Sequence, residues 1–558
     1  MKHASSVEQL CGRLWTPHVV IKCAQPISHL NEDYNASARE SSFPSRCASL
    51  PQNLNLKDYP GATVTIAKYL PANSTIDHAA EGRNATCIAM FDAPPLPVNI
   101  CRLQLRVPTS HSSGVIMEAW LPENWSGRFL STGNGGLAGC IQYSDIAYAT
   151  KYGFAAVGTD NGHPGTSPGA FYHQPEVLRD FVWRALYTGV VVGKEITRQF
   201  YGKRHAKSYY FGCSTGGRQG FKAVQDHPEL FDGVVAGAPA IEFTGTLGWA
   251  TAMMATLWNP ASEEYLSEQD WQQVTKEVVR QCDGKDGVKD GIIEAVQNCK
   301  PDLLNLKCRV DNQSEWCLSE VKFEGLKRVY GPLVDQGMIR YPGLTPGAEA
   351  ATQAGWKLFR DLNTISEWIR FVVKEDEHYN VVPTTQDAVD ILRTNPFNIR
   401  TFETDISKFR KRGGKVLHWH GQVDELLPIG TSDRYYDLVA QTLKASPNEL
   451  DSFYRYFRIS GMNHCAGGPG GWAIGQAWGT SASDHPNDNV LLSIVDWVEK
   501  GKAPGFIRGT KWLNDDPAQG VVFTRKHCKY PDVNRYFGTG NGTDEDGWRC
   551  VRNGHGTH

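Results

Sequence analysis

Several features are missing from this 558-residue sequence, and each absence excludes a class of protein. No run of 18 or more apolar residues occurs, so the sequence predicts no membrane-spanning helix. The formal net charge is only −3, which is not typical of a protein that binds nucleic acid. Repeats and low-complexity tracts are absent, and the first eleven residues contain no apolar segment like that of a signal peptide.

Cysteine, by contrast, is abundant, with 14 residues in the chain. In a secreted protein this even number predicts up to seven disulfides, whereas in a reducing compartment it would be a liability. Six N-x-S/T glycosylation sequons also favour secretion. They begin at Asn35, Asn73, Asn84, Asn124, Asn312 and Asn541. We therefore expect a secreted, extracellular protein even though the first residues do not resemble a signal peptide.

The sequence alternates short apolar runs with helical patterns before and after a different central block. Residues 1–45 are polar and patternless, and we expect a leader or arm there. Residues 46–240 contain strand-like runs, and these are 115–121, 154–158, 208–212 and 231–237. A helical pattern covers 177–200. Strands that alternate with helices predict a mostly parallel sheet that is covered on both faces.

Residues 241–400 have a helical character and carry four closely placed cysteines, and the strand pattern resumes at 415–421. A helical block that interrupts a sheet pattern suggests a lid over an active site. The predicted organisation is thus an α/β-hydrolase domain in two parts, 46–240 and 401–558, with an inserted lid domain at 241–400.

The segment 212–216 reads Gly-Cys-Ser-Thr-Gly and matches the pattern G-x-S-x-G. The pattern alone is weak because glycine and serine are common. Here a strand precedes it and a helix-like stretch follows, which is the context that a nucleophile elbow requires. We predict that Ser214 is a catalytic nucleophile; the alternative is an ordinary glycine-rich turn.

A serine nucleophile needs a histidine base oriented by a carboxylate, and in this fold the chain order is Ser, Asp or Glu, His. Asp424 follows the strand-like run 416–419, at the sheet edge where such folds place their chemistry. His464 follows a later strand-like run. His418 and His420 precede the aspartate and break the order, so we expect them to pack or to form local hydrogen bonds.

Two cysteines flank the predicted catalytic residues, because Cys213 precedes Ser214 and Cys465 follows His464. If nucleophile and base are in contact, these cysteines lie within disulfide reach. The sequence therefore predicts a bridge that ties the two catalytic loops together; the alternative is unpaired or differently paired thiols.

An oxyanion intermediate needs two backbone N–H donors. In this fold the residue after the nucleophile, Thr215, supplies one. The glycine-rich loop 133–139 is the candidate for the other, with Gly135 or Gly136 as the donor. A simple turn is the alternative interpretation of that loop.

Together, the segment 212–220, Asp424 and the pair His464-Cys465 resemble the CS-D-HC arrangement of the tannase and feruloyl esterase family. The resemblance extends over roughly 46–550. Segments 133–143 and 160–163 are more similar to fungal type-B feruloyl esterases than to tannases. The resemblance implies an α/β-hydrolase fold with a lid and an esterase that acts on phenolic-acid esters. The chain departs from the family in its first residues, which include the additional pair Cys11 and Cys23.

Between Cys282 and Cys299, three aspartates are separated by glycines, and carboxylate oxygens suit a hard cation such as Ca²⁺. The run is not an EF-hand, because Lys285, Gly287 and Val288 stand where acidic or amide residues and a glycine are needed. The family resemblance instead implies a structural calcium site formed by Asp283, Asp286 and Asp290 with backbone oxygens of Val288 and Ile292. A solvated acidic turn is the alternative.

The resemblance also implies the remaining disulfides, which are Cys47–Cys101, Cys87–Cys140, Cys282–Cys299, Cys308–Cys317 and Cys528–Cys550. We expect a serine carboxylic ester hydrolase that releases hydroxycinnamic acids from plant cell-wall polysaccharide through an acyl-enzyme. A tannase that cleaves galloyl esters, a non-catalytic binding relative and a serine peptidase are the alternatives. Lid aromatics such as Phe243, Trp249 and Trp258 are candidates to stack on the acid, although each also suits an ordinary lid core.

Overall fold

In this computed structural model, the structure describes residues 42–91, 93–309, 316–361 and 363–552. The predictions for Cys11, Cys23, Asn35 and Asn312 lie outside the described residues, as does almost all of the arm 1–45. Every element below belongs to one compact unit, Phe43–His558. None of the helices in the described ranges is long and apolar enough to cross a membrane.

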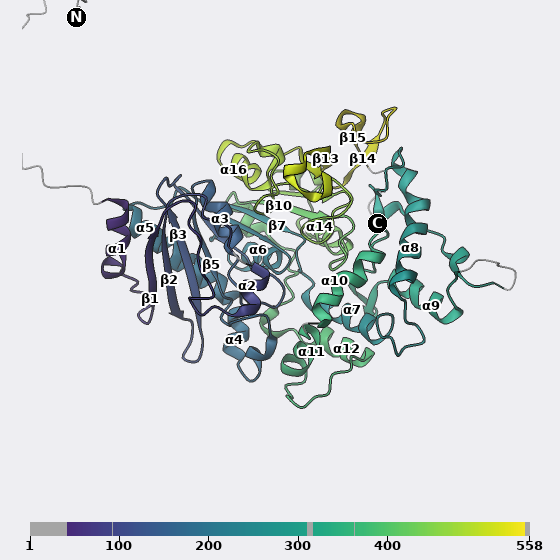
Figure 1. The fold of residues 1–558 in the computed structure, drawn as a ribbon, viewed down its shortest axis with the longest axis horizontal. Coiled ribbons are helices and arrows are strands. Elements are labelled where there is room, and N and C mark those ends of the chain that lie inside the picture. Colours follow the sequence, from purple (N-terminus) through teal and green to yellow (C-terminus); the bar gives the residue numbers. More distant parts are fainter. Residues whose placement is uncertain (1–41, 92, 310–315, 362, 553–558) are drawn as a thin grey trace, which may run out of the picture. The chain divides into compact units, whose positions relative to one another are not determined.

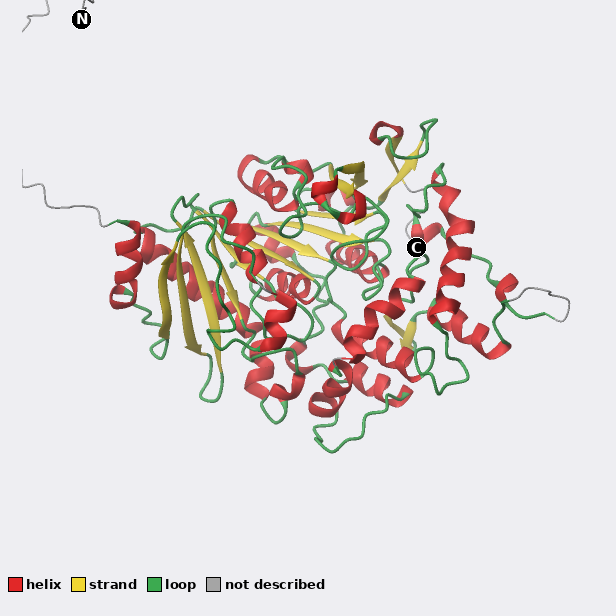
Figure 2. Cartoon of the chain, viewed as in Figure 1, coloured by secondary structure: helices red, strands yellow, loops and turns green. Residues whose placement is uncertain are grey.

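A nine-stranded sheet crosses the unit (Figures 1 and 2). In spatial order its strands are β1 (Thr63–Leu70), β2 (Ile100–Pro108), β3 (Gly114–Pro122), β5 (Ala155–Thr159), β4 (Arg128–Thr132), β6 (Lys207–Cys213), β7 (Gly233–Gly237), β10 (Lys415–Gly421) and β11 (Tyr454–Ile459). The strands from β5 to β11 are parallel, as predicted, whereas β1, β2 and β3 pair in antiparallel fashion. This is the predicted α/β-hydrolase fold.

Alternate side chains of the strands enter two separate hydrophobic cores. On β6, for example, Tyr210 enters one core, and Tyr209 and Phe211 enter the other. Both faces of the sheet are therefore buried beneath helices. The first core includes α1 (Phe43–Asn53), α5 (Ala185–Tyr201), α6 (Thr215–Asp226) and α14 (Gly430–Leu443), and the second includes α3 (Tyr143–Lys151) and α16 (Val490–Lys500).

The helix predicted over 177–200 is present, but one turn departs from the α-helical pattern. It comprises α4 (Pro175–Arg179), the π-helical turn η2 (Asp180–Arg184) and α5. The C-cap Gly202 ends α5 with a φ of +70°, a conformation that glycine adopts without strain. Shorter helices complete this part, namely α2 (Ala85–Phe91), α13 (Ser407–Lys411) and α15 (Pro447–Leu450).

The block 241–400, which follows β7, is mainly helical and lies beside the sheet (Figure 1). Its helices are α7 (Phe243–Ala255), α8 (Glu268–Cys282), α9 (Glu320–Val329), α10 (Glu349–Asp361), α11 (Thr364–Trp368), the π-helical turn η6 (Ile369–Val373) and α12 (Thr385–Arg393). It also contains a hairpin that the sequence analysis did not predict, formed by β8 (Leu333–Asp335) and β9 (Met338–Tyr341). The turn of this hairpin has positive φ at Gln336 and Gly337, the backbone twist that tight hairpins favour.

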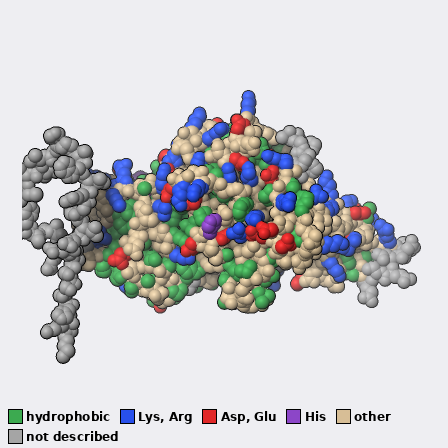
Figure 3. Space-filling view, turned by 90° about the horizontal axis from the view of Figure 1, so that it is seen from above, with side chains coloured by type: hydrophobic (Ala, Val, Ile, Leu, Met, Phe, Trp, Pro, Cys, Tyr) green, Lys and Arg blue, Asp and Glu red, His purple; other side chains and the backbone are tan. Residues whose placement is uncertain are grey.

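Two further hairpins follow α16. They are formed by β12 (Phe506–Trp512) with β13 (Val521–Cys528), and by β14 (Asp532–Tyr536) with β15 (Trp548–Arg552). A bridge between Phe457 and Lys529 joins them to β11. The six disulfides that the sequence analysis predicted are all formed. On the face seen in Figure 3, basic and acidic side chains are interspersed among apolar ones.

Candidate active site

Ser214 occupies a sharp turn between the end of β6 and the start of α6. Its backbone has φ +63° and ψ −123°, a strained conformation for a residue other than glycine. The surrounding glycines are required by close packing. A Cβ on Gly217 would lie 2.3 Å from the carbonyl oxygen of Gly237, and a Cβ on Gly216 would lie 3.1 Å from that of Asn134. The turn therefore has the strand–turn–helix geometry of a nucleophile elbow.

The structure brings Ser214, His464 and Asp424 together although 250 residues separate the serine from the histidine. His464 Nε2 lies 2.9 Å from Ser214 Oγ, and His464 Nδ1 lies 2.8 Å from Asp424 Oδ2. These distances fit a base that accepts the serine proton and a carboxylate that orients the base. The arrangement can perform nucleophilic attack on a carbonyl.

The two oxygens of Asp424 have different partners. Oδ1 accepts hydrogen bonds from the backbone N–H groups of Leu426 (2.9 Å) and Leu427 (2.7 Å). Oδ2 contacts His464 and also lies 3.1 Å from Nε2 of the buried His420. The sequence analysis expected His420 to pack or to form a local hydrogen bond, and this bond to Asp424, four residues away, is local, although the analysis did not name that carboxylate as the partner. His420 lies near the end of β10 and Asp424 three residues beyond that end, and this short spacing was the available signal.

The electrostatics of the site favour an ionised aspartate. Burial alone would raise the pKa of Asp424, but the charge of His464 and the hydrogen bonds from His420 and His464 hold that pKa well below its usual range. Burial would lower the pKa of His464, but the adjacent Asp424 carboxylate raises it above its ordinary value. Since the base must be neutral to accept a proton, activity should fall as pH drops through the raised pKa of His464.

The predicted oxyanion donors lie beside the nucleophile. Gly135, Gly136 and Ser214 line one cavity, and the hydroxyl of Thr215 donates to the carbonyl oxygen of Gly136 over 2.6 Å. Within the described ranges, the backbone N–H groups of Gly135, Gly136 and Thr215 have no acceptor in the protein. They are thus available to an oxyanion, and the choice between Gly135 and Gly136 stays open.

The Cys213–Cys465 disulfide joins the loop that carries the nucleophile to the loop that carries the base. It links positions 252 residues apart with a Cα–Cα distance of 6.1 Å. Small displacements between nucleophile and base are costly in catalysis. A covalent link at this point restricts the motion of Ser214 relative to His464.

A cavity of about 380 Å³ opens at Ser214 and His464. An apolar recess of about 50 Å³ continues from it, and the two share Gly136, Ser214 and His464 among their lining residues. Phe243, Leu247 and Trp356 line the recess. Of the three lid aromatics named from the sequence, Phe243 reaches the site. Trp249 and Trp258 are instead buried and pack edge to face with each other within the helical block 241–400.

The predicted calcium residues lie in the turn that follows α8. Asp283 Oδ1 accepts from the backbone N–H groups of Asp290 and Gly291, and Asp290 Oδ2 pairs with Arg525 at 2.8 Å. Asp286 Oδ2 is buried and has no hydrogen-bond partner. No three His, Cys, Asp or Glu side chains of the described segments form a ready metal cluster. The predicted set relies in addition on backbone oxygens of Val288 and Ile292.

Comparison with known proteins identifies the chain. The model of the family described as tannase and feruloyl esterase matches residues 101–551. The chain belongs to the tannase and feruloyl esterase family. It is 44% identical over 518 residues to a probable feruloyl esterase B-2 of Aspergillus terreus, which covers 92% of this chain and 97% of the relative.

Solved structures of this family resemble the chain as well. Feruloyl esterase B from Aspergillus oryzae is 44% identical, with a TM-score of 0.85 over 91% of this chain and all of that one. Tannin acyl hydrolase from Aspergillus niger shares the fold, with 21% identity and a TM-score of 0.69 over 92% of this chain and 96% of that one. Membership of the tannase and feruloyl esterase family confirms the prediction of a carboxylic ester hydrolase.

Proposed function

We propose that this chain is a feruloyl esterase, which hydrolyses esters of hydroxycinnamic acids. The hydrogen-bonded arrangement of Ser214, His464 and Asp424 carries the proposal. The 44% identity to relatives that bear the name feruloyl esterase B supports the substrate class.

The geometry supports a two-step reaction through an acyl-enzyme. Ser214 Oγ attacks the ester carbonyl while His464 Nε2 takes its proton, and the oxyanion accepts hydrogen bonds from Thr215 and the loop at Gly135 and Gly136. His464 then protonates the departing alcohol oxygen. Water, deprotonated by the same histidine, attacks the acyl-enzyme carbonyl; the bond to Ser214 Oγ then breaks, the histidine returns the proton to that oxygen, and the acid is released.

The apolar recess favours a hydroxycinnamoyl group over a galloyl group. Its walls include Phe243, Leu247 and Trp356, and its polar side chains apart from the catalytic pair are threonines. A pocket built to bind three ring hydroxyls would need several hydrogen-bonding groups around the ring. The walls of this recess instead suit the face and edge of an aromatic ring.

The substrate class can be tested with four esters, which are methyl ferulate, methyl caffeate, methyl gallate and p-nitrophenyl acetate. We expect a higher kcat/KM on methyl ferulate or methyl caffeate than on methyl gallate, because the recess is apolar. Initial rates at several concentrations give the comparison. A preference for methyl gallate by about tenfold, which is roughly 1.4 kcal/mol of transition-state binding, would favour a tannase instead.

We also propose a structural calcium ion in the turn after α8. The buried and unpartnered Oδ2 of Asp286 fits a cation ligand, and Asp283 and Asp290 lie in the same turn. The backbone oxygens of Val288 and Ile292 would complete the set. Bound there, the ion would neutralise neighbouring carboxylates and stabilise the turn, which lies apart from the triad in the sequence and takes no part in its chemistry.

Removal of the ion should lower thermal stability. EGTA is expected to reduce the melting temperature of the wild type by a few degrees, since a ligand that binds only the folded state contributes about 2–4 kcal/mol at saturation. Asp286→Ala should melt at the same reduced temperature as the wild type in EGTA, and EGTA should not change the melting temperature of this variant further. Asp546→Ala, which alters a fully exposed carboxylate, serves as the control. Purified protein without calcium by elemental analysis would contradict the proposal.

We further propose that the protein is secreted and acts on feruloyl groups of plant cell-wall polysaccharide. Six disulfides suit an oxidising compartment, and the sequon asparagines Asn73, Asn84, Asn124 and Asn541 are exposed. Mass spectrometry of the culture medium tests whether the protein is secreted. A search for glycosylated peptides at these four sites tests the modification.

A further inference from the structure

One wall of the active-site cavity carries polar groups that the reaction steps above do not use. Asp145 and Gln142 line the same cavity as Ser214 and His464. Among the described residues, no hydrogen bond or ion pair engages the Asp145 carboxylate. The amide nitrogen of Gln142 is buried and also has no partner. Polar groups left unpaired in a partly closed cavity cost free energy unless a ligand completes them.

The protein supplies little that stabilises the charged form of the Asp145 carboxylate. Burial raises the pKa of Asp145 to about 7, and burial is the sole cause. Within the described segments, no charged side chain or hydrogen bond opposes the shift. A ligand hydroxyl that donates a hydrogen bond to the carboxylate would supply the missing stabilisation.

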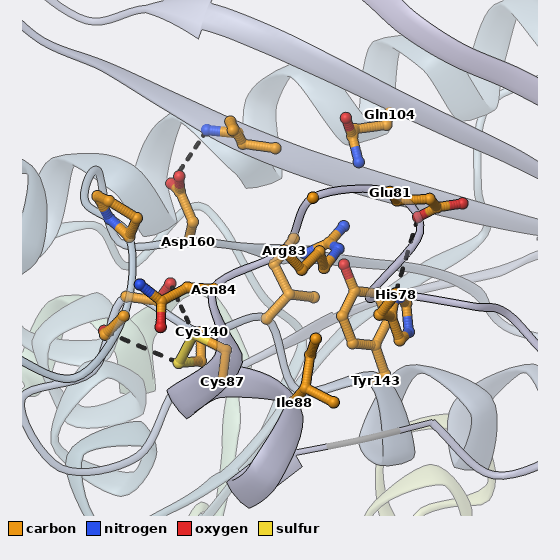
Figure 4. Close-up of a pocket in the computed structure, with 16 residues that line it drawn as sticks. His78, Glu81, Arg83, Asn84, Cys87, Ile88, Gln104, Cys140, Tyr143 and Asp160 are labelled. Atoms are coloured by element: carbon orange, nitrogen blue, oxygen red, sulfur yellow. Dashed lines mark hydrogen bonds and ion pairs between the residues drawn. A yellow bond between two sulfur atoms is a disulfide. The ribbon is translucent and has the colours of Figure 1, made fainter.

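The helix turn that carries Asp145 is held in place by its neighbour Tyr143. The Tyr143 hydroxyl donates to the buried carboxylate of Glu118 over 3.1 Å. Its ring stacks on His78 with 4.1 Å between ring centroids, and the Arg83 guanidinium lies 4.5 Å from the ring centre. Figure 4 shows Tyr143 beside His78 and Arg83 in a neighbouring pocket. These contacts limit how far Asp145 can move to find a partner within the protein.

A disulfide fixes the chain just before the same turn. Cys140 is bonded to Cys87 on α2, close to the pocket drawn in Figure 4. Gln142 follows two residues later and Asp145 three residues after that. The two unpaired groups are thus presented to the cavity by a segment that is anchored at Cys140 and at Tyr143, which is the preorganisation that a binding site requires.

The two sides of the cavity differ in the ligand that they suit. The recess with Phe243, Leu247 and Trp356 is apolar and suits the aromatic acid. Asp145 offers acceptor oxygens and Gln142 offers a donor, a combination that matches hydroxyl groups, which both donate and accept. In an ester of a phenolic acid with a polysaccharide, the sugar carries most of the hydroxyls.

We propose that Asp145 and Gln142 form a subsite for the sugar that carries the ester, in which Asp145 accepts hydrogen bonds from sugar hydroxyls. This inference rests on the proposed function, since it assigns the leaving alcohol of that reaction. The subsite contributes to the choice of alcohol and leaves the acid to be selected by the recess.

The test compares Asp145→Ala with the wild type on a feruloylated arabinofuranosyl oligosaccharide and on methyl ferulate. The ratio of kcat/KM on the sugar ester to kcat/KM on the methyl ester should fall about tenfold, mainly through KM. Asp145→Asn, which keeps one acceptor oxygen, should lose less. Asp546→Ala is the matched control and should leave the ratio unchanged. Melting temperatures show that each variant is folded.

Three results would overturn the proposal. One is an unchanged ratio in Asp145→Ala. Another is an equal loss on both ferulate esters. The third is a loss on methyl ferulate with no loss on methyl cinnamate, which would place the ring hydroxyl at Asp145.

A second experiment does not depend on the hydrolysis of ferulate esters. An unesterified arabino-oligosaccharide should inhibit hydrolysis of p-nitrophenyl acetate, with an inhibition constant at least fivefold higher in Asp145→Ala than in the wild type. If the wild type hydrolyses neither ferulate ester, the proposed function fails while this experiment still tests the subsite. An inhibition constant that Asp145→Ala does not change would overturn the subsite itself.

Discussion

Replacement of Ser214 by alanine is expected to reduce esterase turnover by a factor on the order of 10³ or more while the protein stays folded. The variant removes only the oxygen that lies 2.9 Å from His464 Nε2. The backbone hydrogen bonds of residue 214 do not involve that oxygen: its N–H donates to the carbonyl of Gly237, and its carbonyl accepts from the N–H groups of Arg218 and Ala240. The loss should therefore appear in chemistry and leave stability nearly unchanged.

Steady-state rates on methyl ferulate, together with melting temperatures, measure this effect. A serine-reactive phosphonate should label the wild type at residue 214 and fail to label that position in Ser214→Ala. Ser49→Ala, on the exposed face of α1, is the control for a serine substitution as such. Residual activity within about tenfold of the wild type would be incompatible with Ser214 as the nucleophile.

Asp424→Asn is expected to lower kcat by about 10⁴-fold, the size of loss that follows when a triad histidine is held in the wrong tautomer. Two backbone donors, Leu426 N–H and Leu427 N–H, require an acceptor at the position of Oδ1. The asparagine must therefore direct its carbonyl oxygen there and its NH₂ group toward His464 Nδ1. The histidine then carries its proton on Nε2, where it cannot accept the proton of the serine.

The pH dependence of the residual activity separates this explanation from simple unfolding. The Asp424 carboxylate raises the pKa of His464, so its removal should lower that pKa. Because the active base is the neutral form, the acid limb of the kcat profile should move to lower pH in Asp424→Asn. Asp546→Asn should leave both the rate and the profile unchanged. A profile with the wild-type acid limb would argue against Asp424 as the partner of His464.

The elements that the sequence analysis predicted well have patterns that depend on neighbours in the chain. The strands at β3, β5, β6 and β10 are short apolar runs, and the turn at Ser214 carries its glycines within five residues. The unexpected hairpin of β8 and β9 and the π-helical turn η2 have weaker local signals. Their backbone is decided in part by what packs against them, which no local pattern records.

Some features of the candidate site could likewise be predicted from local sequence, and others could not. Ser214, Asp424 and His464 could be named from motif, chain order and flanking cysteines. The unpaired state of Asp145 could not be predicted, nor could the fact that Phe243 lines the recess while Trp249 and Trp258 do not. Both depend on distances between segments that lie far apart in the chain. The contact of His420 with Asp424 is local, but the sequence did not show which acceptor His420 would use.

The sequence by itself determined the fold class and the family, and it predicted the residues of the triad, because the elbow motif and strand patterns are local. The tertiary structure alone decided which aromatic lines the recess, which oxygen of Asp424 faces His464, and that Asp145 and Gln142 stand unpaired in the cavity. Those properties arise when loops from distant segments converge at one edge of the sheet, where burial and the supply of hydrogen-bond partners are set by the whole fold.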